Sequence, residues 1–384
     1  MMDEADELNV AMLGTKFMGR AHAHAWRTAG RFFDLPVEPA LRVVAGRDAE
    51  ATQAFADHWG FERATTRWRS AVTDPEVDLV DVGTPNDVHA EQAITALEAG
   101  KHLACEKPLA GTLDDARAMR DAARKAAGET FVWYSYRRVP AVALAHQLVQ
   151  SGWVGRIYHV RAAYLQGWGG PETPLLWRFR KGVAGSGSLG DLNAHIVDMA
   201  RFVTGEEIVE VSGAIVETFI KERPLVDDPG RTGRSTVDDA VLFLARMKGG
   251  AAASFESTRL ATGVKNSNRL EIHGERGAIR FNFERMNELE VFSADDPPHL
   301  QGWRTIQVTH EEHPWTGSWW PDGHGLGYEH TFVNQAADIA IALGGGTPVV
   351  PMPDFADAYE TQRVLEAAVV SARERCAIRL SQIR

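Results

Sequence analysis

The triplet Glu106-Lys107-Pro108 contains a lysine whose neighbours could fit it for chemistry. A lysine can hold a substrate hydroxyl and share its charge with that oxygen, provided that a neighbour fixes its position and that it is partly removed from water. Pro108 removes one backbone donor and restricts Lys107 to an extended conformation. The triplet therefore predicts a positioned catalytic lysine, although Pro108 could instead lie in the first turn of a helix over 109–127.

A carboxylate and an imidazole, Asp191 and His195, follow a glycine-serine turn and open a predicted helix that runs through Phe202. Their four-residue spacing puts both on one helix face, so they could serve one substrate. Histidine titrates near neutral pH, so His195 could take the proton from an alcohol as its hydride leaves. Alternatively, Asp191 could only cap the helix beside a core histidine, or the pair could be half of a metal site. No third ligand can be identified, and we expect no metal.

The first half of the sequence predicts the elements that would carry Lys107. Short apolar runs alternate with helical patterns, which is typical of βαβ units and of a parallel, doubly wound sheet. The expected strands are 8–13, 41–45, 79–82 and 102–105, and the expected helices are 21–29, 49–59 and 89–99.

A glycine turn joins the first strand to the first helix and resembles a dinucleotide fingerprint. Gly14 permits a tight turn, Gly19 permits close helix–strand packing, and the helix N-terminus offers N–H groups to a pyrophosphate. The middle glycine of the fingerprint is replaced by Lys16, which could contact a phosphate or be a solvated loop lysine. We predict that the turn Gly14-Thr15-Lys16-Phe17-Met18-Gly19 binds a dinucleotide.

Two further segments are placed for cofactor contact. Thr84-Pro85-Asn86 follows the third strand, at the edge where doubly wound sheets bind ligands. The second strand is followed by Gly46-Arg47-Asp48, with no carboxylate directly at the strand end. Arg47 could bind a 2′-phosphate, because a guanidinium matches phosphate oxygens in bidentate fashion. The sequence thus slightly favours NADP over NAD, while Asp48 keeps NAD open.

The second half predicts a large, mainly antiparallel sheet, because strand-like runs follow one another with glycine turns. We expect an α/β protein with a Rossmann domain over 1–130 and a second α/β domain over 131–384. A late helix, about 354–375, could pack back towards the first domain. The expected strands of the second domain are 157–165, 209–219, 240–247, 251–258 and 270–273.

Composition excludes several classes of protein. The formal charge of -11 argues against a nucleic-acid surface and fits a small neutral substrate. The N-terminal residues 1–7 lack the features of a signal peptide, and no window resembles a membrane span. Cys105 and Cys376 are far apart in the sequence, so we expect reduced thiols and a cytoplasmic protein.

Together these motifs resemble the glucose-fructose oxidoreductase and inositol dehydrogenase family (Gfo/Idh/MocA), over nearly the whole chain. Segments 136–142, 164–168 and 177–179 resemble its subgroup of levoglucosan and related pyranoside 3-dehydrogenases. The resemblance implies an NAD(P)-binding Rossmann domain, a second domain whose open sheet packs in homodimers or homotetramers, and a substrate cleft between the domains. Gly167 departs from the subgroup, which carries an aspartate there.

The resemblance also implies roles for individual residues. Lys107 would hold the reacting oxygen, His195 would act as general base, and Asp191 would bind a hydroxyl and orient the pair. His89 and Glu106 would join the cofactor-binding residues. The sugar pocket would be lined by Tyr136, Gln166, Trp168 and Arg178, although Trp168 and Arg178 could instead pack on the sheet surface.

The resulting hypothesis is reversible oxidation of a secondary alcohol on a pyranoside or cyclitol, with C3 of a pyranoside favoured and the hydride passing to C4 of the nicotinamide. One alternative is a glycosidase that keeps NAD bound, oxidises C3 transiently and eliminates the aglycone. Another is a non-catalytic regulator that only binds the dinucleotide.

Overall fold

The computed structural model describes residues 6–383, and the chain divides into two compact units. The first unit holds the chain up to Arg138 together with the later segments Trp315–Trp320 and Leu326–Tyr359. The second holds Val139–Pro314, Pro321–Gly325 and the chain from Glu360 onwards. Two late segments that we expected in the second domain therefore group with the first unit.

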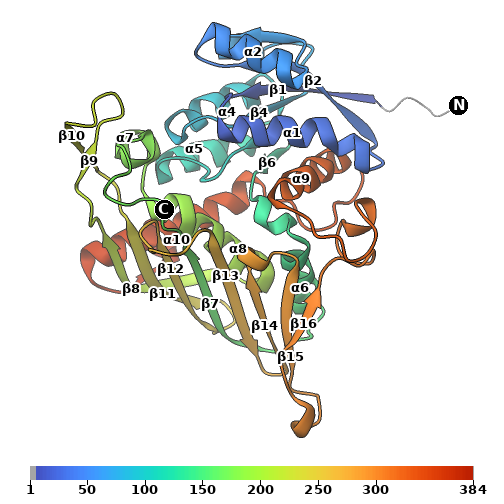
Figure 1. The fold of residues 1–384 in the computed structure, drawn as a ribbon, viewed down its shortest axis with the longest axis vertical. Coiled ribbons are helices and arrows are strands. Elements are labelled where there is room, and N and C mark those ends of the chain that lie inside the picture. The colour runs from blue at the N-terminus through green and yellow to red at the C-terminus, as the bar shows by residue number, and fades with distance from the viewer. Residues whose placement is uncertain (1–5, 384) are drawn as a thin grey trace, which may run out of the picture. The chain divides into compact units, whose positions relative to one another are not determined.

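The first unit is built on a sheet of six parallel strands in the order β3-β2-β1-β4-β5-β6, drawn in blue and cyan in Figure 1. All four residues of β4 (Leu79–Val82) are buried, as expected for an apolar strand covered on both faces. The strand order reverses between β1 and β4, the position at which doubly wound sheets bind ligands. The predicted doubly wound sheet is thus confirmed. Its elements are β1 (Asp6–Leu13), α1 (Phe17–Phe32), β2 (Val37–Ala45), α2 (Ala49–Trp59), β3 (Arg63–Thr65), α3 (Trp68–Val72), β4, α4 (His89–Glu98), β5 (His102–Cys105), α5 (Leu113–Ala123) and β6 (Thr130–Val132).

Two helices of this unit begin elsewhere than the sequence indicates. Helix α1 begins at Phe17, inside the predicted glycine turn, so Gly19 lies in its first turn. Helix α5 begins only after its N-cap Thr112, whose hydroxyl oxygen accepts the Asp115 N–H at 3.1 Å. Pro108 therefore does not open this helix, and the alternative explanation of the Glu106-Lys107-Pro108 triplet is wrong.

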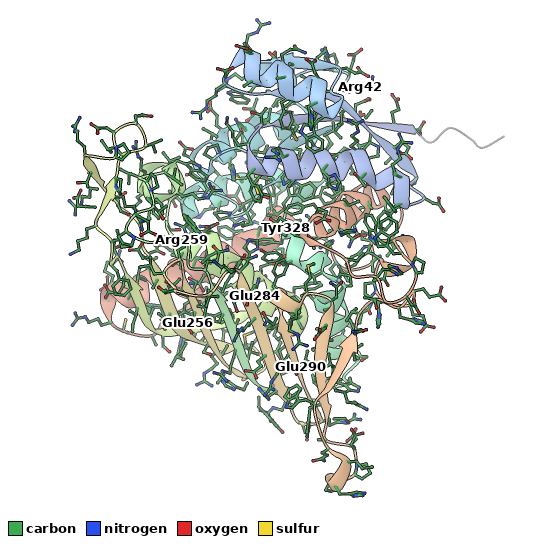
Figure 2. The ribbon with its side chains drawn as sticks, in the orientation of Figure 1. Arg42, Glu256, Arg259, Glu284, Glu290 and Tyr328 are labelled. Atoms are coloured by element: carbon green, nitrogen blue, oxygen red, sulfur yellow. The ribbon has the colours of Figure 1, made fainter. Side chains whose placement is uncertain are left out.

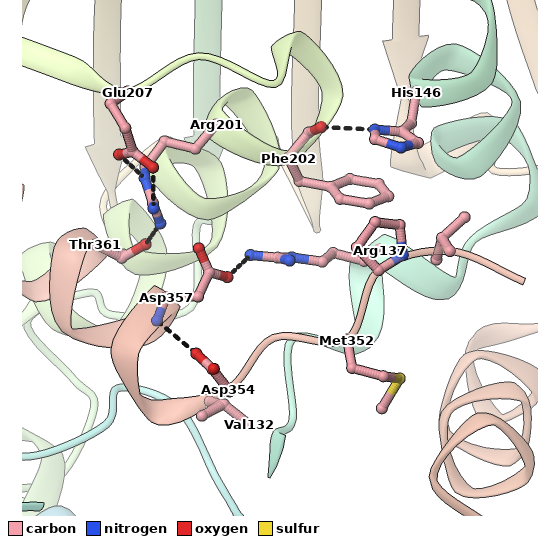
Figure 3. Close-up of polar contacts among 12 residues, drawn as sticks. Val132, Arg137, His146, Arg201, Phe202, Glu207, Met352, Asp354, Asp357 and Thr361 are labelled. Carbon is pink, nitrogen blue, oxygen red and sulfur yellow. Dashed lines mark hydrogen bonds and ion pairs between the residues drawn. The ribbon is translucent and has the colours of Figure 1, made fainter. Parts of the chain in front are cut away.

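A late helix completes the first unit. Helix α9 (Tyr328–Leu343) packs against α1, and Gln335 Nε2 donates to the carbonyl of Val132 at 2.7 Å. The expected C-terminal helix is also present as α10 (Phe355–Glu374), whose residues up to Tyr359 belong to this unit. Asp357 near the start of α10 pairs with Arg137 (Figure 3).

The second unit contains a sheet of nine strands in the order β16-β15-β14-β13-β7-β12-β11-β8-β17 (Figure 1). Every neighbouring pair is antiparallel except β7 and β12, which confirms the predicted mainly antiparallel sheet. Helices α6 and α8 contact this sheet. The elements are α6 (Pro140–Gln150), β7 (Ile157–Leu165), α7 (Lys181–Ala184), α8 (Ala194–Thr204), β8 (Ile208–Glu217), β9 (Glu222–Pro224), β10 (Thr232–Arg234), β11 (Ala240–Met247), β12 (Ala252–Thr258), β13 (Ser267–Gly274), β14 (Gly277–Asn282), β15 (Glu288–Ser293), β16 (Arg304–Gln307) and β17 (Ile378–Arg379).

Helix α8, which carries His195, is fixed at its C-terminal end (Figure 3). Arg201 is buried and donates twice to the Glu207 carboxylate, at 2.7 Å each, and once to the Thr361 hydroxyl at 2.8 Å. His146 Nδ1 lies 2.7 Å from the carbonyl oxygen of Phe202. Bidentate arginine–carboxylate bonds are geometrically specific, so they fix the rotation of the helix as well as its position.

Candidate active site

The glycine turn of the first unit lies against the end of β4. Gly14 has φ +107°, and a Cβ there would lie 2.7 Å from the carbonyl oxygen of Gly83. A Cβ at Gly19 would lie 2.2 Å from the carbonyl oxygen of Gly14. Side chains are thus excluded where a pyrophosphate would approach the backbone N–H groups at the start of α1. The turn fits the predicted dinucleotide, with Lys16 and Phe17 exposed beside it and Met18 half-buried.

The segment Thr84-Pro85-Asn86 also lies at this edge and is braced from within the unit. Thr84 Oγ1 donates to Gln92 Oε1 at 2.7 Å. His89 is fully buried, with Nε2 2.9 Å from the Thr84 carbonyl oxygen and Nδ1 3.3 Å from that of Leu109. Burial lowers the pKa of His89 and keeps its ring neutral. These bonds brace the loop, and the cofactor contact that the family resemblance implies for His89 stays a prediction.

In dinucleotide-binding domains, an acidic side chain at the end of the second strand often accepts hydrogen bonds from the ribose hydroxyls. The end of β2 leaves little room for such a side chain. A Cβ at Gly46 would lie 2.3 Å from Thr52 Oγ1, so this position cannot easily carry a side chain. Asp48 is the N-cap of α2, and its Oδ1 accepts the Ala51 N–H at 2.8 Å. Arg47 is exposed at the strand end, where the prediction for cofactor contact needs it.

Lys107 is half-buried directly after a buried glutamate. Glu106 is 5% exposed, and both of its carboxylate oxygens have partners. Oε2 accepts the Lys107 N–H at 2.9 Å, and Oε1 lies 3.2 Å from His22 Nε2. The lysine backbone is therefore fixed by its own neighbour, as the sequence argument required. Tyr136 belongs to this unit as well, where it is buried in a short helical turn over Ser135–Arg138.

In the second unit, Asp238 fixes the start of the segment that carries Asp191 and His195. Its carboxylate accepts the Gly187 N–H at 2.7 Å, the Leu189 N–H at 2.8 Å and the Ser188 hydroxyl at 2.9 Å. The segment differs from the regular helix that we expected, because Leu189–Asn193 forms a π-helical turn before α8. Such widened turns are frequent at functional sites.

Asp191 lies inside this π turn and is paired with a buried arginine, Arg259. Arg259 directly follows β12 and is labelled in Figure 2. Arg259 Nη2 donates to Asp191 Oδ2 at 2.8 Å, and Nη1 donates to the carbonyl oxygen of Arg178 at 3.3 Å. The segment's N-cap is Ser188, so the explanation of Asp191 as only a helix cap is wrong. Asp191 remains about a quarter exposed and can still accept a bond from a ligand.

The predicted sugar-binding residues Gln166 and Trp168 form a hydrogen-bonded chain near His195. Trp168 Nε1 donates to Gln166 Oε1 at 2.6 Å, and Gln166 Nε2 donates to Asn266 Oδ1 at 2.6 Å. The same Asn266 oxygen accepts the Tyr164 hydroxyl at 2.8 Å. The Tyr164 ring centroid is 5.8 Å from that of His195, which is 8% exposed. The structure thus gathers one polar and aromatic surface around His195.

Trp168 and Arg178 lie outside the strands, since β7 ends at Leu165 and the next strand is β8. The Arg259 guanidinium lies 5.2 Å from the Trp168 ring centroid, within the range of cation–π attraction. Arg178 is half-buried and stacks on Trp177 at 4.4 Å. Both residues thus belong to connecting segments, Arg178 to the short helical turn Trp177–Phe179, and their role in sugar binding stays a prediction.

Sequence reasoning missed Arg259, Asn266 and Asp238 as parts of this site. All three stand in loops next to strands, far in the chain from the residues they hold. Arg259 follows β12 directly, and its position after a strand end was the one signal that could have found it.

Residues 6–383 contain no group of three or more His, Cys, Asp or Glu side chains placed to hold one metal ion. No helix among them is both long and apolar enough to cross a bilayer.

The six-stranded sheet and the glycine turn at its switch point define an NAD-binding Rossmann domain, here joined to a domain with a mainly antiparallel sheet. Residues 8–134 match the oxidoreductase family with an NAD-binding Rossmann fold, and residues 142–280 match the GFO/IDH/MocA C-terminal domain. The chain belongs to the GFO/IDH/MocA family and is an NAD-binding oxidoreductase.

Several relatives match over nearly the whole chain. Levoglucosan dehydrogenase of Pseudarthrobacter phenanthrenivorans is 41% identical over 392 residues, covering 98% of this chain and 99% of its own. A solved levoglucosan dehydrogenase complex with NADH and levoglucosan has a TM-score of 0.93 and 42% identity, covering 97% and 99% of the two chains. An oxidoreductase domain protein from Kribbella flavida has a TM-score of 0.94 and 50% identity, covering 98% and 99%.

Proposed function

We propose that this enzyme oxidises a secondary alcohol of a pyranose sugar or cyclitol, reversibly, with C3 of a pyranoside as the favoured position. The observation that carries the proposal is the Asp191–Arg259 pair beside His195, in a chain similar over its whole length to levoglucosan dehydrogenase. A carboxylate that accepts a hydrogen bond from a buried guanidinium is fixed in orientation, which suits it to bind a sugar hydroxyl.

Each catalytic residue then has one task. Lys107 holds the alcohol oxygen and shares its positive charge with it, and His195 takes the hydroxyl proton as the C–O bond becomes a carbonyl. Asp191 accepts a hydrogen bond from a neighbouring hydroxyl and orients the ring. The bound nicotinamide supplies the acceptor for the hydride that leaves the same carbon. Loss of the hydroxyl proton to His195 and of the hydride to the nicotinamide would convert the secondary alcohol into a ketone and leave His195 protonated.

The sugar would bind to the hydrogen-bonded side chains around Gln166. The face of Trp168 suits the C–H surface of a pyranose, and the amide of Gln166 suits one of its hydroxyls. Tyr136 and Arg178 complete the proposed pocket, as the family resemblance implies. The exposed fraction of Trp168, 36%, leaves ring surface for such a contact.

We propose NAD as the cofactor. The solved levoglucosan dehydrogenase complexes contain NADH, at 42% identity to this chain. This outweighs the slight preference for NADP that we drew from Arg47, because Asp48 stands beside it and can still accept a ribose hydroxyl. The cytoplasmic location expected from the sequence stays a prediction.

The test is a cofactor-reduction screen with NAD and NADP over levoglucosan, glucosides, inositols and xylose. We expect turnover of at least one pyranoside with NAD, and a new ketone at C3 by NMR of the product. Lys107→Ala and His195→Ala should each lower kcat/KM by about a hundredfold or more. The exposed residues Lys125 and His299 provide matched controls, since Lys125→Ala and His299→Ala should leave activity unchanged.

Two results would contradict the proposal. Full activity in both Lys107→Ala and His195→Ala would remove the proposed site. Release of aglycone from a chromogenic glycoside without accumulated NADH would identify the glycosidase instead.

We also propose that the exposed face of the nine-stranded sheet packs against a second copy of the chain. Leu242 and Leu244 of β11 and Ile215 of β8 are exposed there, at 38%, 56% and 52%. Leu242 lies opposite Ile215 in the sheet, so the apolar side chains are contiguous. Charged side chains of both signs flank them, including the pair Arg161–Glu271. The family resemblance implies packing through this sheet, and the combination suits a self-complementary interface.

A further inference from the structure

In the first unit, a histidine is buried between two carboxylates, one of which belongs to Glu106, the residue before Lys107. His22 lies on α1 and is fully buried, as is Asp81 of β4, while Glu106 is 5% exposed. His22 Nδ1 lies 3.0 Å from Asp81 Oδ1, and Nε2 lies 3.2 Å from Glu106 Oε1. From its position in the sequence, just after the glycine turn, His22 is expected only to pack or to belong to the cofactor loop. The proposed reaction gives it no task.

Both ring nitrogens of His22 face carboxylate oxygens, which indicates the doubly protonated ring. A neutral imidazole has one donor, and its second nitrogen would direct a lone pair at a carboxylate. Stacking supports the charge, since the Trp133 ring lies 4.2 Å from the His22 ring at an interplanar angle of 23°. Burial opposes protonation, but the charges and hydrogen bonds of Asp81 and Glu106 outweigh it and raise the pKa of His22 to about 9.

Asp81 is itself held in place by two indole donors. Trp26 Nε1 donates to Oδ2 at 2.7 Å, and Trp133 Nε1 donates to Oδ1 at 3.0 Å. With His22, this carboxylate has three donors and satisfies the requirement for a buried charge. The network is therefore anchored in α1, in β4 and in the segment after β6.

Burial keeps two further titratable groups next to Glu106 uncharged. His89 faces Glu106 from α4, and burial lowers its pKa, which keeps it neutral. Cys105 precedes Glu106, and burial raises the pKa of its thiol. Phe332 of α9 covers the His22 ring at 5.8 Å and is not ionisable. The cationic group that contacts both Asp81 and Glu106 is therefore His22.

A chain of contacts leads from this imidazolium to the proposed catalytic lysine. His22 binds Glu106 Oε1, and Glu106 Oε2 accepts the backbone N–H of Lys107 at 2.9 Å. Removing His22 would leave two buried carboxylates without their cation, and one of them would have to take up a proton. A protonated or rotated Glu106 would no longer hold the lysine backbone in the same way.

We propose that His22 is a positioning residue for Lys107, acting through Glu106, and that it connects the helix of the phosphate-binding turn to the catalytic lysine. The proposal rests on the function proposed for Lys107. Because His22 lies one and a half turns into α1, the helix N-terminus that would hold the pyrophosphate and the lysine backbone belong to one buried network.

Two measurements that need no activity test the network itself. Nitrogen-15 NMR of histidine-labelled protein should show His22 with both ring nitrogens protonated at pH 7.5. Amide hydrogen exchange at Lys107 should be at least tenfold faster in His22→Gln than in the wild type. The control is His24→Gln, on the same helix, where the half-buried ring contacts Trp59 and Thr28. A neutral His22 at pH 7.5, or unchanged exchange at Lys107, would overturn the proposal.

Kinetics then test the connection to function. We expect His22→Gln to lower kcat about tenfold, to leave KM for NAD within about twofold, and to change the pH profile of kcat, with His24→Gln unchanged. If His22→Gln does not fold, Glu106→Gln replaces it, and the NMR titration should then show His22 losing its proton at a lower pH than in the wild type. An unchanged titration of His22 in Glu106→Gln would refute the network. An inactive wild type with an intact network would refute the proposed function and leave the buried network standing.

Discussion

Several buried charges of the described residues stand in pairs or small networks, such as Arg138–Asp338, Arg223–Asp239 and His22 with Asp81 and Glu106. Asp338 shows the cost, since burial raises the pKa of its carboxyl although Arg138 lies at 3.2 Å. Removing one member of such a pair lowers the free energy of unfolding, because the remaining charge is buried without a partner and without solvation by water. The His22 network differs from the other pairs in having one cation for two anions, so its stability depends on a proton.

This dependence predicts how stability changes with pH. The pKa of His22 is about 9 in the folded protein against 6.5 for the free side chain, so between these values the folded state binds more protons than the unfolded state. The contribution is therefore complete below about pH 6.5 and is lost as the pH rises through about 9, with a total on the order of 3 kcal/mol. The measurement is the difference in unfolding free energy between the wild type and His22→Gln from pH 6 to pH 10. It should shrink with rising pH, and a constant difference would contradict the assignment.

At the scale of elements, the strands were predictable wherever an apolar run was long enough to require burial. The run 79–82 became β4 and 157–165 became β7, within the predicted bounds. The three-residue β3 was missed because Arg63–Thr65 is polar and its pairing with β2 is decided by tertiary contacts. The Asp191–His195 spacing was visible in the sequence, whereas the π turn was not, because Asp238 imposes it from a loop about fifty residues away.

The role of Asp238 gives the prediction for this scale. Asp238→Ala removes three hydrogen bonds from the start of the Asp191–His195 segment and leaves two buried backbone N–H groups without their acceptor. We expect a loss of about 2–4 kcal/mol in unfolding free energy and at least a tenfold loss in kcat. Circular dichroism during urea unfolding measures the first, and the dehydrogenase assay the second. Asp228→Ala, at an exposed turn between β9 and β10, is the control and should change neither. Wild-type stability in Asp238→Ala would show that the segment holds its conformation by itself.

At the scale of the whole molecule, the distribution of apolar surface bears on the proposed association of two copies of the chain. The protein carries a formal charge of -11, which disfavours non-specific association. Its nine-stranded sheet nevertheless exposes Ile215, Leu242 and Leu244 together. On an antiparallel sheet that faces water, side chains at such positions are usually polar. A second copy would bury these side chains and pair the flanking charges of both signs, whereas a charged substitution would bury an unpaired anion.

The prediction is therefore that the wild type elutes as a dimer or tetramer in size-exclusion chromatography with light scattering. Leu244→Glu should shift it to a smaller species at micromolar concentration, because each symmetric interface would have to bury two uncompensated carboxylates at a cost of several kcal/mol. Val226→Glu, an equally exposed valine between β9 and β10 at 57%, provides the matched control for added charge and should leave the mass unchanged. A monomeric wild type, or an oligomer of unchanged mass in Leu244→Glu, would exclude this face as the interface. Retained dehydrogenase activity in a monomeric Leu244→Glu would further show that each chain carries a complete site, because none of the proposed catalytic residues lies on that face.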